Sequence, residues 1–311
     1  GLEASFMHSH TFPRIVFLIV LTCFSFGQPP GEGPVPNTAL SETLQISAPE
    51  PAVSTRFGTS LDIDGDRLIV GTPGLKNASN QIIGGAYIFR NQGEQWILEA
   101  RLDCPELDVN NGFGNAVAIS GDTAVIGASN AKLGTPHSQG AVYVFVKTEG
   151  GWTFQKTLDV TERVYGSQLG VSVSIYEDTI VAGSNNDDVG AEYRKGSAYV
   201  FSRSNGTWAL ESRLTDVNAM GHRYGLSVDI HRDRIVVGGP SVVSESGIVS
   251  IGAADVFRKM GAEWIKESRL MASDRHSDDW FGYDVAVFDG SIVVGAPKHK
   301  YGGLAGIGAA Y

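Results

Sequence analysis

Carboxylates and imidazoles are the side chains of this sequence that could do chemistry, and some of the carboxylates fall in short clusters. Two acidic pairs, Asp187-Asp188 and Asp278-Asp279, lie in predicted loops, where their oxygens and backbone carbonyls could together bind a ligand or a hard cation. Solvated loop carboxylates are the commoner case, so both interpretations stay open. A third acidic segment, Asp62-Ile63-Asp64-Gly65-Asp66, has the composition of a hairpin turn between two strands.

Four histidines also fall in predicted loops, each in a different loop, and no metal-ligand spacing recurs among them. They are His137, His222, His276 and His299. We therefore expect surface histidines. The sequence contains no GxSxG, no HExxH and no Gly-rich phosphate loop after a strand, so no catalytic motif indicates an enzyme.

Composition excludes further classes. With 24 Lys+Arg against 34 Asp+Glu, the net charge is −10, and no basic cluster offers the electrostatic footprint that nucleic acid requires. Two cysteines, Cys23 and Cys104, cannot form a disulfide framework and do not make a CxxC motif. Cys104 is expected to be a half-buried loop thiol without chemistry.

The first residues have the pattern of a secretory signal. An apolar run over 15–26 follows Arg14 and is succeeded by a Pro/Gly-rich stretch. The run is too short to span a bilayer, which takes about 20 apolar residues. We expect residues 1–27 to comprise a signal peptide with upstream residues, and 28–39 to be a linker. A secreted or cell-surface location without a transmembrane segment follows.

Behind the linker, the sequence repeats with a period of about 56 residues. Five series recur in step: a tryptophan, a leucine, a glycine that opens a β-like run, a glycine preceded by an aromatic residue or leucine, and another glycine thirteen residues later. The last two series are Gly58, Gly114, Gly170, Gly225 and Gly282, and Gly71, Gly127, Gly183, Gly238 and Gly295. Repeats of this length indicate stacked supersecondary units.

Each unit contains four short runs rich in β-branched and aromatic residues, separated by turn residues. The second run is continuously apolar, typical of a strand covered on both faces, whereas the fourth alternates, as in Trp208, Leu210 and Leu214 against Glu211 and Arg213. Four-stranded antiparallel sheets bury both faces when stacked around an axis, so the sequence predicts an all-β fold, a β-propeller. The in-register tryptophans are expected to pack rather than to bind sugars.

The repeating unit resembles that of a known family. The segment FGYDVAVFDGSIVVGAP, residues 281–297, is similar to the FG-GAP repeat of the integrin α-chain β-propeller. The resemblance implies an extracellular propeller, usually of seven blades, used for adhesion or ligand display. It also suggests calcium, held by loops of the DxDxDGxxD kind. Asp62, Asp64 and Asp66 come nearest to that pattern, but the turn is too short to wrap an ion, so a hairpin turn is favoured and no cofactor is expected.

The predicted propeller covers residues 40–311. An orphan outer strand occupies 40–46, and the repeats lie near 47–102, 103–158, 159–214, 215–270 and 271–311, the last ending inside its third strand. A seven-blade ring would need further units beyond Tyr311, so a truncated chain is favoured over a closed five-blade ring.

Strand parity places the long, varied connections on one side of the propeller. They are 72–83, 128–139, 184–195, 239–251 and 296–307 together with 103–112, 159–168, 215–223 and 271–280. Loops on a rigid scaffold commonly carry binding, so we expect a module that binds an extracellular protein or glycan there. The alternatives are an axial enzyme using Asp62, Asp229 and Asp284, or a structural scaffold. Asn77 and Asn205 begin N-glycosylation sequons, relevant in a eukaryotic host.

Overall fold

The computed structural model describes residues 44–311 apart from positions 94, 107, 135–137, 161–165, 191, 217–219, 244–249, 301, 303 and 305. The predicted signal peptide, the linker and residues 40–43 of the predicted outer strand lie outside the described residues. Residues 44–46 form no strand, and Ile46 packs against the first sheet. Within the described part every regular element is a strand.

Five antiparallel sheets follow one another along the chain, each with its strands in sequence order. Blade 1 consists of β1 (Leu61–Asp64), β2 (Arg67–Gly71), β3 (Gly85–Asn91) and β4 (Trp96–Asp103). Blade 2 consists of β5 (Ala116–Ser120), β6 (Thr123–Ala128), β7 (Ala141–Thr148) and β8 (Gly151–Leu158). Blade 3 consists of β9 (Leu169–Tyr176), β10 (Thr179–Ser184), β11 (Ser197–Ser204) and β12 (Thr207–Leu214).

Blades 4 and 5 depart slightly from this plan. Blade 4 consists of β14 (Val228–His231), β15 (Arg234–Gly239), β17 (Ala253–Met260) and β18 (Glu263–Leu270). Two short strands in its loops, β13 (Met220–His222) and β16 (Ser241–Val243), pair with each other. Blade 5 has three strands, β19 (Asp284–Phe288), β20 (Ser291–Ala296) and β21 (Ala309–Ala310). Tyr311 directly follows β21.

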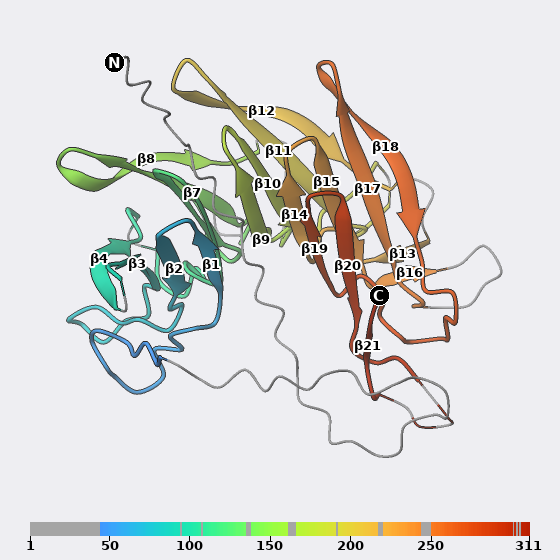
Figure 1. Ribbon diagram of the computed structural model, residues 1–311, viewed down its shortest axis with the longest axis horizontal. Helices are drawn as coiled ribbons and strands as arrows, with labels where there is room; N and C mark the ends of the chain where they lie inside the picture. The colour runs from blue at the N-terminus through green and yellow to red at the C-terminus, as the bar shows by residue number, and fades with distance from the viewer. Residues whose placement is uncertain are drawn as a thin grey trace, which may run out of the picture.

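The first strand of each blade lies innermost, and these strands contact one another in chain order, β1 with β5, β5 with β9, β9 with β14 and β14 with β19. The blades consequently follow each other around an axis, from blue to red in Figure 1. The predicted all-β propeller is confirmed. Its four largest apolar clusters each combine residues of two neighbouring blades, for example Ile88 of blade 1 with Ile126 of blade 2, so most of the core lies between blades.

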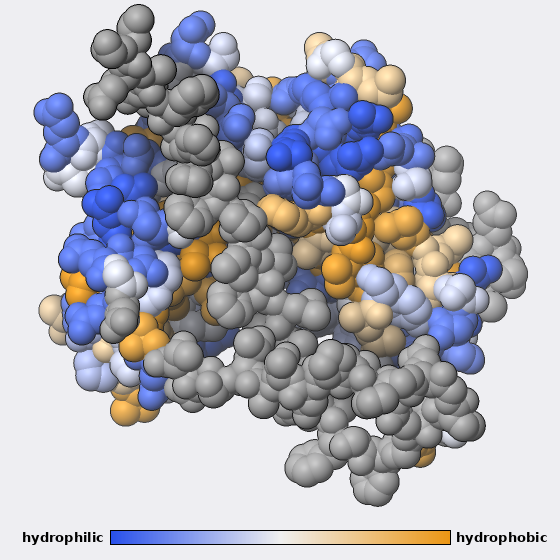
Figure 2. Space-filling view, in the orientation of Figure 1, coloured by the Kyte–Doolittle hydropathy of each residue, from blue (hydrophilic) through white to orange (hydrophobic). Residues whose placement is uncertain are grey.

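Burial of the second strands follows their position between neighbours. Every residue of β6 is buried, because blades 1 and 3 cover its two faces. In β20 burial alternates instead: Val294 is buried against blade 4, whereas Val293, on the opposite face, is 36% exposed. Figure 2 shows hydrophobic residues gathered over this part of the molecule. The expectation of two covered faces therefore fails for β20 in the described structure.

Two glycines of each repeat fix how a blade meets the next. The glycine after the aromatic residue has a positive φ, and in blade 2 the N–H of Gly114 donates to the carbonyl of Gly127, 3.1 Å away, which explains the spacing of thirteen. A methyl group at Gly127 would overlap the carbonyl oxygen of Gly170 in blade 3. A methyl group at Gly71, Gly183 or Gly238 would likewise overlap a backbone carbonyl oxygen of the next blade. At Gly295 the nearest atom to such a methyl group belongs to Asp284 of its own blade, at 3.7 Å.

The outer strands carry a feature that the alternation had not revealed. In each of the four, one residue is inserted relative to the third strand: in blade 3 Val200 pairs with Ser212 and Phe201 with Leu210, so Glu211 occupies a β-bulge. Beyond the bulge the two faces exchange. The expected common face of Trp208, Leu210 and Leu214 is therefore wrong: Trp208 packs between blades 2 and 3, Leu214 packs between blades 3 and 4, and Leu210 is 47% exposed.

Candidate functional site

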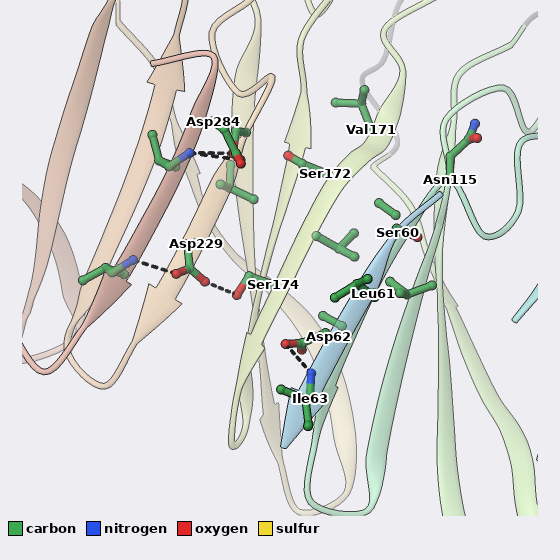
Figure 3. Close-up of a pocket in the computed structure, with 18 of the residues that line it drawn as sticks. Ser60, Leu61, Asp62, Ile63, Asn115, Val171, Ser172, Ser174, Asp229 and Asp284 are labelled. Atoms are coloured by element: carbon green, nitrogen blue, oxygen red, sulfur yellow. Dashed lines mark hydrogen bonds between the residues drawn. The ribbon is translucent and has the colours of Figure 1, made fainter. Parts of the chain in front are cut away.

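The axis of the propeller is lined by polar side chains that connect neighbouring blades. In Figure 3, Asp229 accepts hydrogen bonds from the Ser174 hydroxyl (2.7 Å) in blade 3 and from the backbone N–H of Val287 (2.7 Å) in blade 5. Similar bonds recur from one inner strand to the next. The acceptor side chains and the donating backbone N–H groups are Asp62 and Ile119, Asp64 and Gly121, Ser120 and Glu177, Ser174 and Ile230, Asp229 and Val287, and His231 and Asp289. We call these contacts the inner-strand latches.

The structure places the three axial aspartates around one cavity of about 310 Å³, which the inner strands of all five blades line. Asp62 accepts the N–H groups of Ile63 and Ile119, at 2.9 and 2.8 Å. Asp284 accepts the Ser227 hydroxyl at 2.9 Å and the Val285 N–H at 3.1 Å. These carboxylates thus point toward the axis but are engaged by neighbouring strands.

The predicted turn aspartates do not converge on a common centre. Asp62 and Asp64 both reach to blade 2, where Asp64 accepts the Gly121 N–H at 2.6 Å. Asp66 instead pairs with Arg90 at 2.8 Å, and the hydrogen bond from this guanidinium lowers the pKa of the Asp66 carboxyl. Each of the three carboxylates thus has a separate partner: Asp62 and Asp64 form inner-strand latches, and Asp66 forms a surface ion pair.

On the opposite side, hydrogen bonds confirm that the two sets of long connections lie together. The N–H of Tyr224, after the 215–223 connection, donates to the carbonyl of Lys195 in the 184–195 connection, at 3.0 Å. Phe281 and Ile251 make the equivalent bond between the next pair of loops, at 3.3 Å. We call this side the long-loop face.

The first acidic pair is tied into its own blade. Asp187 is 1% exposed, and its carboxylate accepts hydrogen bonds from the Tyr199 hydroxyl and from Arg213, the latter at 2.8 Å. Asp188 accepts the backbone N–H of Arg194 at 2.8 Å. Burial and pairing give these two residues a structural role in holding the 184–195 loop, beside the ligand-binding role predicted for them.

The second pair divides differently, because Asp278 is exposed and Asp279 is fully buried. Asp279 Oδ2 accepts the backbone N–H of His276 (2.6 Å) and lies 3.2 Å from His299 Nδ1. The expectation of separate surface histidines is therefore wrong for His276 and His299, which meet in blade 5, and His299 is 4% exposed. The sequence hid this pairing because the two histidines come from different loops. His137 and the side chain of His222 lie outside the described residues.

Two further residues surround His299. Its Nε2 lies 3.5 Å from Asp274 Oδ2, and the Tyr311 hydroxyl lies 3.3 Å from its Nδ1. The Tyr311 hydroxyl donates to Asp274 Oδ1 at 2.6 Å, which lowers the pKa of the Asp274 carboxyl. Burial, followed by the hydrogen bond and charge of Asp274, raises the pKa of Tyr311.

An aromatic and cationic cluster lies beside this group on the long-loop face. The rings of Trp280 and Tyr283 are stacked, with centroids 5.8 Å apart and planes inclined by 8°. Lys298 Nζ lies 3.4 Å from the centroid of a Trp280 ring, and the Arg223 guanidinium carbon lies at 5.7 Å. Tyr283 is 44% exposed. Sequence reasoning missed this cluster because Trp280 stands outside the repeating tryptophan series.

The repeating tryptophans pack against apolar side chains, as expected: three of them lie between blades, and Trp96 packs against a cluster within blade 1. Trp208 is 1% exposed, and Trp152 and Trp264 contact apolar clusters that join two blades. The bulged glutamates bridge blades as well: Glu99 pairs with Lys147 and Glu211 with Lys259. These residues belong to the scaffold.

The predicted N-glycosylation sites are accessible. Asn77 is half-buried in a long loop, and Asn205 is exposed in the hairpin turn between β11 and β12.

Cys104 is half-buried and receives a hydrogen bond from Asn111 Nδ2 at 3.1 Å, and burial raises the pKa of its thiol.

Antiparallel blades joined by backbone-to-backbone glycine contacts around an axis define a β-propeller. Among protein families, the FG-GAP repeat matches residues 40–89, 96–145, 152–201 and 264–311, so the chain belongs to the FG-GAP repeat family. The matches skip 202–263, yet blade 4 there has the same four-strand order. A comparison with curated proteins gives no match. None of the described residues form a helix that could cross a membrane.

Proposed function

We propose that this FG-GAP propeller is a secreted or cell-surface module that binds an extracellular protein or glycan through its long-loop face. The observation that supports this function best is the stacked pair of Trp280 and Tyr283 with Lys298 and Arg223 beside it. Aromatic and arginine side chains supply much of the affinity at binding surfaces. Two cations next to an aromatic surface favour a ligand that combines an apolar face with negative charge.

The supporting scaffold is rigid where the ligand would bind. Trp280 has a φ of +60° and occupies the same repeat position as Arg56, Gln168 and Arg223, whose φ values lie between +58° and +69°. A left-handed conformation at a bulky residue is costly, so surrounding structure must hold it. The repeat therefore presents these side chains in a fixed direction, which reduces the entropy that binding would cost.

Binding rather than turnover is the second part of the proposal. Each axial aspartate that could serve as an acid or base is engaged in hydrogen bonds with neighbouring strands, as Asp229 is with Ser174 and Val287. A substrate panel that includes glycosides, esters and uronic-acid polymers should give no turnover. Turnover abolished by Asp229→Asn, with the fold retained, would establish the enzyme alternative instead.

The binding test is a screen of acidic and neutral glycans and of extracellular-matrix proteins against the purified chain. Trp280→Ala should lower the affinity for the tightest-binding ligand of the screen by at least about tenfold, as expected for a hot spot, without lowering the melting temperature. Gln168→Ala, at the same position of blade 3, is the matched control and should bind normally. A ligand unaffected by Trp280→Ala, or no binding across the screen, would contradict the proposal.

A further inference from the structure

Two loops of blade 5 bring together a group of metal-ligating side chains that the repeat does not require. The 271–280 and 296–307 connections are joined by a hydrogen bond from the Lys298 N–H to the Asp279 carbonyl, at 3.2 Å. The carbonyl of His299 accepts the N–H groups of Ile307 and Gly308, at 3.1 and 3.3 Å. The backbone thereby fixes Asp279 and His299 opposite each other.

The ligand atoms lie at coordination spacing. Asp279 Oδ2 is 3.2 Å from His299 Nδ1 and 3.7 Å from His276 Nδ1. One ligand atom from each of the three residues lies within 4.8 Å of the other two. Zinc bonds of 2.0–2.2 Å to nitrogen and oxygen place tetrahedral ligands about 3.3 Å apart, so small side-chain movements would close the group around one ion.

An unsatisfied atom supports a ligand at this place. Asp279 is fully buried, and its Oδ1 has no hydrogen-bond partner among the described residues. A buried carboxylate without full pairing is costly, which the charge of a bound cation would offset. His276 is largely exposed, so an ion could enter from the long-loop face.

Comparison with other blades shows that the repeat itself does not need these residues. The positions equivalent to Asp279 in blades 1 to 3 hold the neutral Thr55, Asn111 and Ser167. The position equivalent to His299 in blade 3 holds Asp187, which Arg213 pairs at 2.8 Å. Around Asp279, the described side chains within ion-pairing distance are the two imidazoles.

We propose that His276, Asp279 and His299 bind a divalent transition-metal ion of the zinc type on the long-loop face of blade 5. Two imidazoles and one carboxylate suit zinc, whereas calcium and magnesium prefer sets of oxygen ligands. Asp274 lies beside the other ring nitrogen of His299, where an outer carboxylate commonly orients a metal-bound histidine. A fourth coordination position is left to water or to a ligand atom.

The test is calorimetric titration of the full chain, stripped with a chelator, with zinc sulfate and separately with calcium chloride. We expect His276→Gln to remove one equivalent of bound zinc, or to weaken that equivalent at least about tenfold, with the zinc-free melting temperature unchanged. Zinc should raise the melting temperature of the unmodified chain, and calcium should not. Cobalt loaded at this site should give the absorption bands of a tetrahedral ion.

Asp278→Asn is the matched control, since it removes the exposed neighbour and should keep the zinc equivalent. Asp279→Asn should lose it; if that variant fails to fold, His299→Asn provides the second ligand deletion. Equal zinc binding by the unmodified chain and His276→Gln would show a hydrogen-bonded group only and overturn the proposal. Loss of zinc in Asp278→Asn to the same extent would overturn it too. None of these outcomes depends on the long-loop face binding a protein or glycan.

Discussion

At the scale of single residues, burial decides what a side chain of a given type does in this protein. Asp66 and Asp187 are both paired with arginine, but Asp66 is exposed and Asp187 is buried. An exposed pair contributes about 0–1 kcal/mol to stability, whereas removing one partner of a buried pair costs several times more. The structural importance of Asp187 therefore exceeds that of Asp66, although the sequence presents both as loop carboxylates.

Cys104 makes stability depend on alkaline pH. Because burial raises the pKa of its thiol in the folded state, the unfolded chain loses this proton first as pH rises above about 8.5. Its contribution to stability is thus complete below that pH and is lost progressively above it. Melting curves from pH 7 to 10 should show a smaller alkaline decrease for Cys104→Ser than for the unmodified chain, and identical decreases would refute this.

Residue-scale features were the least predictable from sequence. The sequons and the half-buried thiol could be located because a local pattern defines them. The contact of His276 with His299 could not be predicted, because the two histidines are 23 residues apart in the sequence. They meet only through the folded path of their two loops. Trp280 could not be singled out either, because the repeat pattern marks only residues that recur, and no tryptophan recurs at this position.

At the scale of elements, the inner strands are joined by side chains as well as by apolar packing. Each latch satisfies a backbone N–H that faces the neighbouring blade rather than its own sheet. Asp229 connects both neighbouring blades, with Ser174 on one side and Val287 on the other. The carboxylates that sequence analysis considered for an axial active site therefore also hold the axis together.

Asp229→Ala should lower the free energy of unfolding by about 1–3 kcal/mol, because the Val287 N–H loses its acceptor in a partly buried place. Chemical denaturation measures this loss. Asp66→Ala is the control, since it breaks an exposed ion pair and should cost less than about 1 kcal/mol. Equal effects of the two substitutions would argue against the latch.

Strand order and strand positions could be predicted because hydrophobic period and turn residues are local properties. The bulge in each outer strand could not, since inserting one residue leaves the 56-residue period intact and shows only in the pairing partner. The sequence thus predicts a regular alternating strand with Trp208, Leu210 and Leu214 on one face, whereas the bulge at Glu211 turns Leu214 to the other face. The apolar run of β20 likewise indicated two covered faces, because sequence does not say which neighbour a face meets.

At the scale of the whole molecule, stability depends on one kind of junction used four times. Gly127→Ala should lower the free energy of unfolding by about 1–3 kcal/mol or more, since the added methyl group overlaps the Gly170 carbonyl oxygen and the backbone must move. Gly295→Ala places the same group where the nearest atom lies 3.7 Å away, and should change stability by less than about 0.5 kcal/mol. Similar losses in both variants would contradict a junction-specific effect.

The glycine junction also bears on how such a chain can change over generations. Because each junction joins backbone to backbone, it places few demands on which side chains the two blades carry. Recombination between equivalent points of two repeats removes or adds one whole blade and recreates the same junction, whereas an exchange out of register separates the two glycines from their partners. Blade number in a gene of this design can therefore vary by copying, while the loops of each copy diverge independently.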